Sequence, residues 1–207
     1  MFLHMKHTMM MRQNTADVVR NVPLLLLLFL FLLPACDEEE KYSTSYPCSF
    51  VFYCSNHPDC ALSLAVTNPG QMVIVYPQLR DGVTHLILIP NQGNWTSQQT
   101  DVAMVTAIEN DRLSYDRMGA SRRLVIGMSN FNGLKCYDGH CPRCLSTGTT
   151  GNYPLHWLSD GKLVECSNCQ AQYNTDAEGV AVNAGEESLR LIEYRIEYNG
   201  TQLYAHN

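Results

Sequence analysis

Two Cys-x-x-Cys pairs constrain this chain more than any other feature of its sequence. The pairs are Cys141–Cys144 and Cys166–Cys169, and the segment between them, residues 145–165, is 21 residues long. Two residues between cysteines in a tight turn point both sulfurs at one ion, and four thiolates complete a tetrahedral site that suits zinc or iron. Asp160-Gly161 predicts a β-hairpin between the pairs, which would bring them together. The predicted metal ligands are therefore Cys141, Cys144, Cys166 and Cys169.

Two other chemistries could use these cysteines. Each pair could close as a small disulfide, or one pair could exchange disulfides with other proteins. A redox CxxC usually lies next to a βαβ pattern, and no helical period follows either pair, so metal ligation is the preferred interpretation. His140 precedes the first pair and is expected to be a solvated loop histidine, with a metal ligand or a hydrogen-bond donor to a ligand as the alternative. His156 and Trp157 are expected on a strand, with the indole packed beneath the metal site.

The chain has nine cysteines in 207 residues, and four of them stand apart from both the CxxC pairs and the N-terminal segment. Four cysteines allow three disulfide pairings, and the sequence does not choose among them. Pairing of Cys54 with Cys60 across a turn-rich loop is the first expectation, with the other two either paired or free. A weak second metal site at His57, Asp59 and Cys60 is a further hypothesis. The candidate disulfide residues are Cys48, Cys54, Cys60 and Cys136.

The N-terminal segment predicts export. Leu24–Leu33 is a run of ten leucine and phenylalanine residues, whereas a helix needs about 20 apolar residues to span a bilayer. Basic residues precede this run, as in an export signal. The sequence Leu33-Pro34-Ala35-Cys36 that ends it resembles the lipobox of bacterial lipoproteins. The resemblance implies cleavage before Cys36 and a lipid on its sulfur.

This resemblance also implies where the protein resides. We expect residues 1–35 to be a signal peptide and residues 36–45, which begin with Asp37–Glu40 after the lipidated cysteine, to be an acidic tether. The expected membrane partner is the lipid bilayer, reached through the lipid on Cys36. The expected location is the outer membrane, the cell surface or the periplasm of a Gram-negative bacterium, where disulfides are permitted.

Composition excludes several functions. A formal net charge of −6 argues against nucleic-acid binding, which needs a basic face. A hydrophobic content of 45% and a charged content of 16% are ordinary for a globular domain. The sequence has no GxSxG or HExxH motif and no phosphate-binding glycine loop. A non-enzymatic role, including that of an electron-transfer accessory, is therefore favoured over catalysis.

Short alternating or apolar runs, broken by turn residues, predict an all-β fold built as an antiparallel sandwich or barrel. Asp101–Asn110 is ambiguous between strand and helix. Ile192–Tyr198 alternates clearly and is followed by Asn199-Gly200, which predicts a second hairpin. The other runs predicted as strands are Ser49–Cys54, Ala61–Val66, Met72–Tyr76, Thr84–Ile89 and Arg122–Met128.

The segment around the CxxC pairs resembles a Rieske-type domain. The residues that carry the likeness are Cys136–Cys144, His156-Trp157 and Val164–Asn174. Rieske domains hold a [2Fe–2S] cluster between a Cys-x-His loop and a Cys-x-x-His loop on a small antiparallel β fold. The resemblance implies a Rieske-like domain over residues 46–207, with a metal-binding subdomain at about residues 136–175.

The departure from the Rieske pattern concerns the ligands, because each loop here has a cysteine where the family has histidine. Histidine ligands raise the potential to about −150 to +300 mV, whereas plant-type four-cysteine clusters lie near about −400 mV. Three groups fit four cysteines: zinc, a single iron, and a four-cysteine [2Fe–2S] cluster. The leading hypothesis is a structural zinc in a module that binds an unknown protein. The alternative is an electron-transfer protein with iron or the cluster at the same site and an unknown redox partner.

Overall fold

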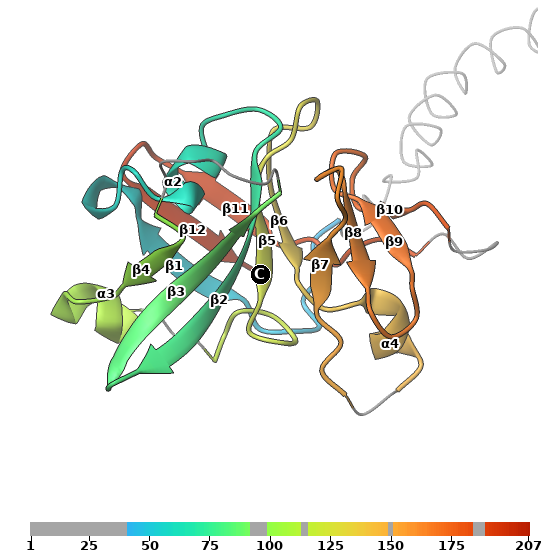
Figure 1. The fold of residues 1–207 in the computed structure, drawn as a ribbon, viewed down its shortest axis with the longest axis horizontal. Coiled ribbons are helices and arrows are strands. Elements are labelled where there is room, and N and C mark those ends of the chain that lie inside the picture. Colours follow the sequence, from blue (N-terminus) through green and yellow to red (C-terminus); the bar gives the residue numbers. More distant parts are fainter. Residues whose placement is uncertain (1–40, 92–98, 113–115, 149–150, 184–188) are drawn as a thin grey trace, which may run out of the picture. The chain divides into compact units, whose positions relative to one another are not determined.

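The computed structural model of the protein describes residues 41–91, 99–112, 116–148, 151–183 and 189–207 (Figure 1). These residues belong to one compact unit, Lys41–Asn207. The predicted export signal, Cys36 and its acidic neighbours lie outside the described residues, so lipidation stays a prediction. Among the described residues, no helix is long and apolar enough to cross a membrane.

Strands arranged in three antiparallel sheets dominate the unit, which confirms the all-β expectation. The first sheet has the order β1 (Ser49–Tyr53), β12 (Gln202–His206), β11 (Arg195–Tyr198). The second has the order β4 (Asp101–Ala103), β3 (Val83–Pro90), β2 (Met72–Arg80), β5 (Leu124–Met128), β6 (Leu134–Asp138). The third has the order β10 (Val180–Ala181), β9 (Gln172–Asn174), β8 (Leu163–Cys166), β7 (Leu155–Trp157). The short helices are η1 (Cys54–Asn56), α2 (Ala61–Ala65), α3 (Ala107–Arg112) and α4 (Pro142–Ser146).

The first and second sheets share one hydrophobic core. Phe50 and Phe52 point into it from β1, and Leu203 points into it from β12. Val73 and Leu124 meet them from the second sheet, and all five side chains are almost fully buried. Two antiparallel sheets around a common core form a sandwich, as the strand pattern predicts.

The first sheet joins the two ends of the unit. β1 pairs with β12 in the register Ser49 with His206, and the β11–β12 hairpin places β11 on the other side of β12. The hairpin turns at Asn199-Gly200, where Gly200 has a φ of 91°, a conformation that costs glycine little. This confirms the hairpin predicted from Asn-Gly.

The third sheet carries the CxxC loops and has its own core (Figure 1). Leu155, Val164 and Tyr173 are fully buried there, against Ile74 of the second sheet. β7 and β8 form the hairpin predicted from Asp160-Gly161, with Gly161 at a φ of 66°. A small subdomain built on this hairpin therefore lies against the sandwich.

The strand predicted over Ala61–Val66 is wrong, because the structure has helix α2 in this segment. Its apolar side chains at positions 61, 62, 65 and 66 are buried, whereas Leu64 is only partly buried, so the burial follows one helix face. The Cys60 side chain caps the helix by accepting a hydrogen bond from the Ser63 N–H. The ambiguous Asp101–Asn110 segment contains both β4 and the start of α3.

The domain begins before the predicted boundary at Tyr46. Ser43 donates its N–H to the Glu193 carbonyl at 2.9 Å, and Lys41 lies 3.8 Å from the Glu193 carboxylate. The guanidinium of Arg195 also lies over the Tyr42 ring. Residues 41–45, expected as tether, therefore pack on the domain.

Candidate metal centre

The four cysteines of the CxxC pairs converge on one point. Their Sγ atoms all lie within 4.8 Å of one another. Two contacts cross between the pairs, with 3.5 Å from Cys141 to Cys169 and 3.7 Å from Cys144 to Cys166. Three of the cysteines are buried and Cys169 is partly exposed. The hairpin has thus brought together the residues that the spacing predicts.

The two CxxC pairs have different backbone conformations. Cys141 caps α4, Pro142 begins that helix, and the Leu145 N–H donates to the Cys141 carbonyl at 3.1 Å. The second pair sits in a tight turn at the end of β8, where Gln170 adopts a φ of 57° and donates its N–H to the Cys166 carbonyl at 2.8 Å. A helix start and a left-handed turn therefore aim the four sulfurs at each other.

Several groups donate to the sulfurs, and sequence reasoning missed their roles. The Asn168 amide donates to Cys144 Sγ at 3.4 Å. The Tyr173 hydroxyl lies 3.5 Å from Cys141 Sγ, and the Ala171 N–H bonds to the Cys169 sulfur. Hydrogen bonds of this kind stabilise thiolates. Of these donors, only Asn168 could have been found from the sequence, because it is a polar residue inside the second CxxC turn.

Electrostatics oppose the burial of four thiolates without a cation. Burial raises the pKa of the Cys141 thiol far above its ordinary value, and it also raises the pKa of Cys144. For Cys169, burial raises the pKa, but the Ala171 N–H and the neighbouring thiols lower it more, so the net shift is downward. A cation at the centre would offset the cost of ionising all four sulfurs.

The dimensions of the cluster fit one tetrahedral ion. A zinc ion about 2.3 Å from each of four sulfurs sets the sulfur–sulfur distances at about 3.8 Å. The Cys141–Cys169 and Cys144–Cys166 distances of 3.5 and 3.7 Å, and the upper limit of 4.8 Å for all sulfur pairs, lie around that value. Small side-chain adjustments are enough to complete the tetrahedron.

The histidines next to the site are not members of the cluster. Among the described residues, the only group placed to hold a metal consists of the four cysteines. His140 is 4% exposed, its Nδ1 has no hydrogen-bond partner, and its ring meets Tyr153 edge-on. The expectation of a solvated loop histidine is therefore wrong. His156 lies on β7, as predicted.

A buried carboxylate holds the loop that leads into the first pair. Asp138 ends β6 and is fully buried. Its carboxylate accepts the His140 N–H at 2.8 Å and the Ala120 N–H at 2.7 Å, together with the Tyr194 hydroxyl. Burial raises the pKa of Asp138, and these three donors oppose the rise. The metal loop is thus anchored in the sandwich.

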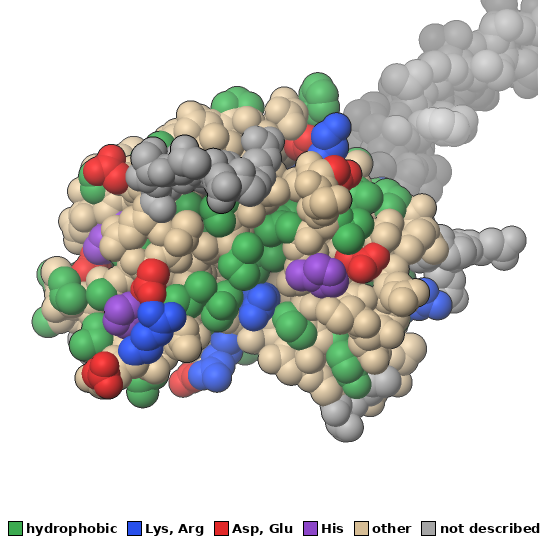
Figure 2. All heavy atoms as spheres, viewed as in Figure 1, with side chains coloured by type: hydrophobic (Ala, Val, Ile, Leu, Met, Phe, Trp, Pro, Cys, Tyr) green, Lys and Arg blue, Asp and Glu red, His purple; other side chains and the backbone are tan. Residues whose placement is uncertain are grey.

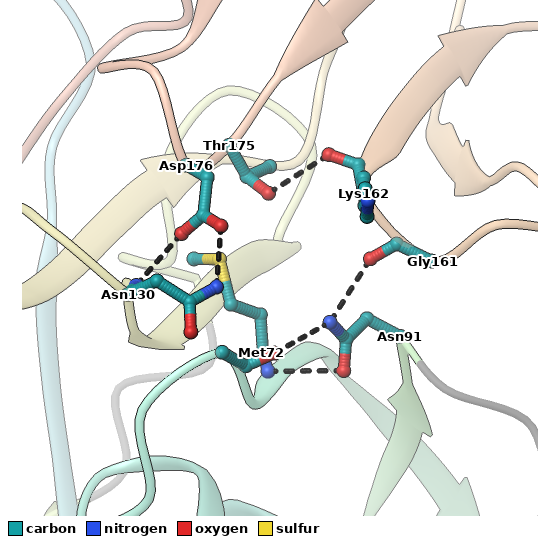
Figure 3. A pocket seen from close by; sticks show the side chains of 8 residues that line it. Met72, Asn91, Asn130, Gly161, Lys162, Thr175 and Asp176 are labelled. Atoms are coloured by element: carbon teal, nitrogen blue, oxygen red, sulfur yellow. Dashed lines mark hydrogen bonds between the residues drawn. The ribbon is translucent and has the colours of Figure 1, made fainter.

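A polar junction joins the metal subdomain to the second sheet around a small pocket of about 60 Å³ (Figure 3). Asp176, which follows β9, accepts hydrogen bonds from the Asn130 N–H and side-chain amide and from the Ser129 hydroxyl. On the opposite side, Asn91 donates to the Gly161 carbonyl at 2.9 Å. The Trp157 indole adds a bond of 2.9 Å to the carbonyl of Ile89 on β3, and it packs against the core of the third sheet.

The four remaining cysteines lie in the sandwich core. Cys48, Cys54, Cys60 and Cys136 are all buried, and the structure presents them as free thiols. Their pairing therefore stays a prediction. The hypothesis of a second metal site at His57, Asp59 and Cys60 is wrong, because no such group is found in the part of the chain that the structure describes. His57 instead bonds to the buried Glu109 carboxylate at 2.9 Å.

No protein-family model matches this chain, and a search of the curated proteins finds no match. The fold and the site by themselves define an all-β protein with a four-cysteine candidate metal site.

Proposed function

We propose that Cys141, Cys144, Cys166 and Cys169 bind one metal ion, zinc in preference to iron, and that this ion holds the two CxxC loops together. The observation that carries the proposal is the convergence of the four sulfurs within 4.8 Å. A four-cysteine [2Fe–2S] cluster places two thiolates on each of two irons, so its thiolate pairs stand farther apart than around one ion. The compact cluster therefore favours a single ion.

A structural role follows from the donor set. Four cysteine ligands fill a zinc coordination sphere and leave no open position for a substrate. When bound, zinc would supply a redox-inert charge that neutralises buried thiolates. The hydrogen bonds from Asn168, Ala171 and Tyr173 would then distribute the remaining negative charge.

We propose a protein-binding module of Rieske-like architecture as the wider role. Support comes from three antiparallel sheets, of which the four-stranded third sheet carries both cysteine loops, as the sequence resemblance implies. Apolar side chains also gather across the middle of one face, and Leu79 of β2 and Ile89 of β3 are exposed (Figure 2). Such exposure suits contact with another protein.

Electron transfer is the second candidate, with iron at the same four sulfurs. The observation that favours it is the partial exposure of Cys169, since the other three ligands are buried. An exposed ligand would give a redox partner a short path to the metal. If the iron were a [2Fe–2S] cluster, the replacement of histidine by cysteine in both loops would give it a low potential.

Anchoring to a membrane through Cys36 completes the proposal. The support is the lipobox-like sequence and the ten-residue apolar run before it. The protein would then belong to the outer membrane, the cell surface or the periplasm of a Gram-negative bacterium. Metabolic labelling with a fatty acid should mark the exported wild type and not Cys36→Ser, and equal labelling of both would refute lipidation at this residue.

The test of the metal is its stoichiometry and colour in protein expressed with its export signal intact. One zinc per chain and no visible absorption are expected, because zinc thiolates are colourless. One iron per chain with visible absorption would favour electron transfer. Protein that contains no metal and no free thiol at the four cysteines would establish the disulfide interpretation instead.

A further inference from the structure

We infer that the cysteine cluster is also a site of oxidation, where a disulfide between Cys141 and Cys169 forms and displaces the metal. The oxidant is a small-molecule or protein disulfide in the surroundings of the exported protein. The inference rests on the proposed metal site and on the proposed export, because an oxidising compartment lets the bond persist. The bond crosses between the two CxxC loops, whereas the CxxC spacing suggests disulfides within each pair.

The sulfurs of Cys141 and Cys169 are in contact across the two loops. They lie 3.5 Å apart, and the sulfurs of Cys144 and Cys166 lie 3.7 Å apart across the same gap. A disulfide has a sulfur–sulfur length of about 2.05 Å, so an approach of about 1.5 Å would form the first bond. Rotation of the two side chains can supply a movement of this size without a change in the strands.

Cys169 is the ligand that an oxidant can reach. It is partly exposed, whereas the other three cysteines have exposures of at most 3%. Its neighbours in the turn, Asn168 and Gln170, are exposed as well. A thiolate must meet the donor disulfide directly, so exposure decides which cysteine reacts. The first sulfur to react is therefore that of Cys169.

Cys141 lies where the second step needs it. Its backbone N–H donates to the Tyr153 carbonyl at 3.2 Å, and its carbonyl accepts the Leu145 N–H at 3.1 Å. The Tyr173 hydroxyl lies 3.5 Å from its sulfur and can donate to the thiolate that departs from the ion. Because the Cys141 side chain is buried, its sulfur reacts with a sulfur already bound to the protein in preference to one in solution.

The chemistry is thiol–disulfide exchange at metal-bound thiolates. The Cys169 thiolate leaves the ion and attacks the donor disulfide, which forms a mixed disulfide and expels one donor thiolate. The Cys141 thiolate then attacks the Cys169 sulfur and expels the donor's other half as a second thiolate. Two cysteine thiolates thus lose two electrons, which reduce one donor disulfide to two thiolates. Cys144 and Cys166 remain as two ligands, too few for a closed zinc site, so zinc is released as Zn²⁺ with its charge unchanged.

The disulfide across the loops would join the same parts of the fold as the metal. Its two cysteines are 28 positions apart, and β7 and β8 lie between them. Metal and disulfide alike therefore tie the start of α4 to the turn after β8. The oxidised, metal-free protein should keep the third sheet more protected from hydrogen exchange than the reduced, metal-free protein. Equal protection in both forms would refute this equivalence of the bond and the metal.

Oxidation of the zinc-loaded full chain tests the inference. The protein is reduced, loaded with zinc, freed of excess reductant and metal, and treated with oxidised glutathione beside a chromogenic zinc chelator. Thiols are then alkylated in denaturant, and the digest is mapped by mass spectrometry without reductant. One zinc released per chain and a linked Cys141–Cys169 peptide are expected, with Cys144 and Cys166 alkylated. A bond within one CxxC pair, or a site that stays loaded and reduced, would overturn the inference.

Zinc content is measured before the oxidant is added, which separates the inference from the proposed function. Reduced protein that binds no zinc, yet forms the Cys141–Cys169 peptide on oxidation, would count against the proposed metal site. Bound zinc without that peptide after oxidation would count against the inference only. Chelator without glutathione should release zinc far more slowly, and equal rates of release with and without glutathione would overturn the coupling of oxidation to metal loss.

Two further experiments locate the sulfur that reacts first. A limiting amount of iodoacetamide should label Cys169 of the zinc-loaded protein ahead of the other three ligands, and earlier labelling of a buried ligand would overturn its role as the entry point. Cys54→Ser is the matched control, because it removes a cysteine of the other core, and it should form the linked peptide as the wild type does. Loss of the peptide in Cys54→Ser would assign the oxidation to a core thiol and overturn the direct route.

Discussion

The hydroxyl of Tyr194 donates a hydrogen bond of 2.7 Å to the carboxylate of Asp138, and both side chains are fully buried. Tyr194 immediately precedes β11 of the first sheet, and Asp138 ends β6 of the second. Asp138 also accepts the His140 N–H, next to Cys141, the first candidate metal ligand. A contact inside the sandwich therefore positions the entrance to the metal loop.

Replacement of this tyrosine by phenylalanine should destabilise the domain. Tyr194→Phe removes a hydrogen bond to a buried carboxyl group, which corresponds to about 2 kcal/mol of unfolding free energy. Chemical denaturation of the metal-loaded protein measures the change. Tyr198→Phe is the matched control, because the Tyr198 hydroxyl bonds to the Gly200 carbonyl at an exposed site, and it should have little effect. Equal stabilities of the wild type and Tyr194→Phe would contradict the anchoring role.

Loss of one sulfur should empty the metal site. Cys166→Ser leaves three thiolates around the ion, and serine is a poor zinc ligand, so metal content should fall and the third sheet should lose order. Elemental analysis and hydrogen exchange over β7–β9 measure the two effects. Cys54→Ser serves as the control, since Cys54 lies in the other core. Unchanged metal content in Cys166→Ser would exclude this residue as a ligand.

Chelation should release the metal more readily at low pH. All four sulfurs must be thiolates to bind the ion, so protons compete with it, and the affinity falls by about tenfold per pH unit for each proton displaced. Equilibration with a chelator between mildly alkaline and mildly acidic pH measures this trend. Metal retention that does not vary with pH would show that the ion is held by groups other than cysteines.

The junction around Asp176 should weaken in acid. Burial raises the pKa of Asp176, but the Asn130 and Ser129 donors lower it more, so its net pKa lies below the ordinary value. The carboxylate therefore contributes stability that is present above the unfolded-state pKa of about 3.9 and is lost as the pH falls through the folded-state value.

Asp176→Asn tests this contribution. It should lower the unfolding free energy by about 1 to 2 kcal/mol at neutral pH, because the amide keeps one acceptor oxygen and replaces the other by a donor, so it cannot accept both from the Asn130 side chain and from the Ser129 hydroxyl and Asn130 N–H. The difference from the wild type should shrink in acid, where the wild-type carboxylate is protonated. Glu197→Gln, at an exposed position, should show no such trend. A difference that persists unchanged in acid would assign the effect of Asp176→Asn to packing rather than to charge.

Local signals predicted much of this structure. Asn199-Gly200 and Asp160-Gly161 form the expected hairpins because their turns require residues that tolerate positive φ. The CxxC spacing predicted the cysteine cluster for a similar reason, since both the turns and the hairpin between them are short-range features.

Features that depend on distant residues escaped prediction. Asp138 and Tyr194 are 56 positions apart, and Ser129 and Asp176 are 47 apart, so no pattern in either segment indicates its partner. The helix at Ala61–Ala65 was mistaken for a strand because five residues are too few to separate the two periods. The burial of His140 also went unpredicted, since it depends on Tyr153 and on the way the loop folds back.

The pairing of β1 with β12 also predicts the order in which the sheets fold. Ser49 must find His206, 157 positions further along the chain, whereas β7, β8 and β9 pair with neighbours that follow within a few residues. Local contacts close faster than distant ones. During synthesis, the cysteine hairpin can therefore assemble before β1 meets its partner strand, and we expect the sandwich to close last, around a third sheet that has already formed.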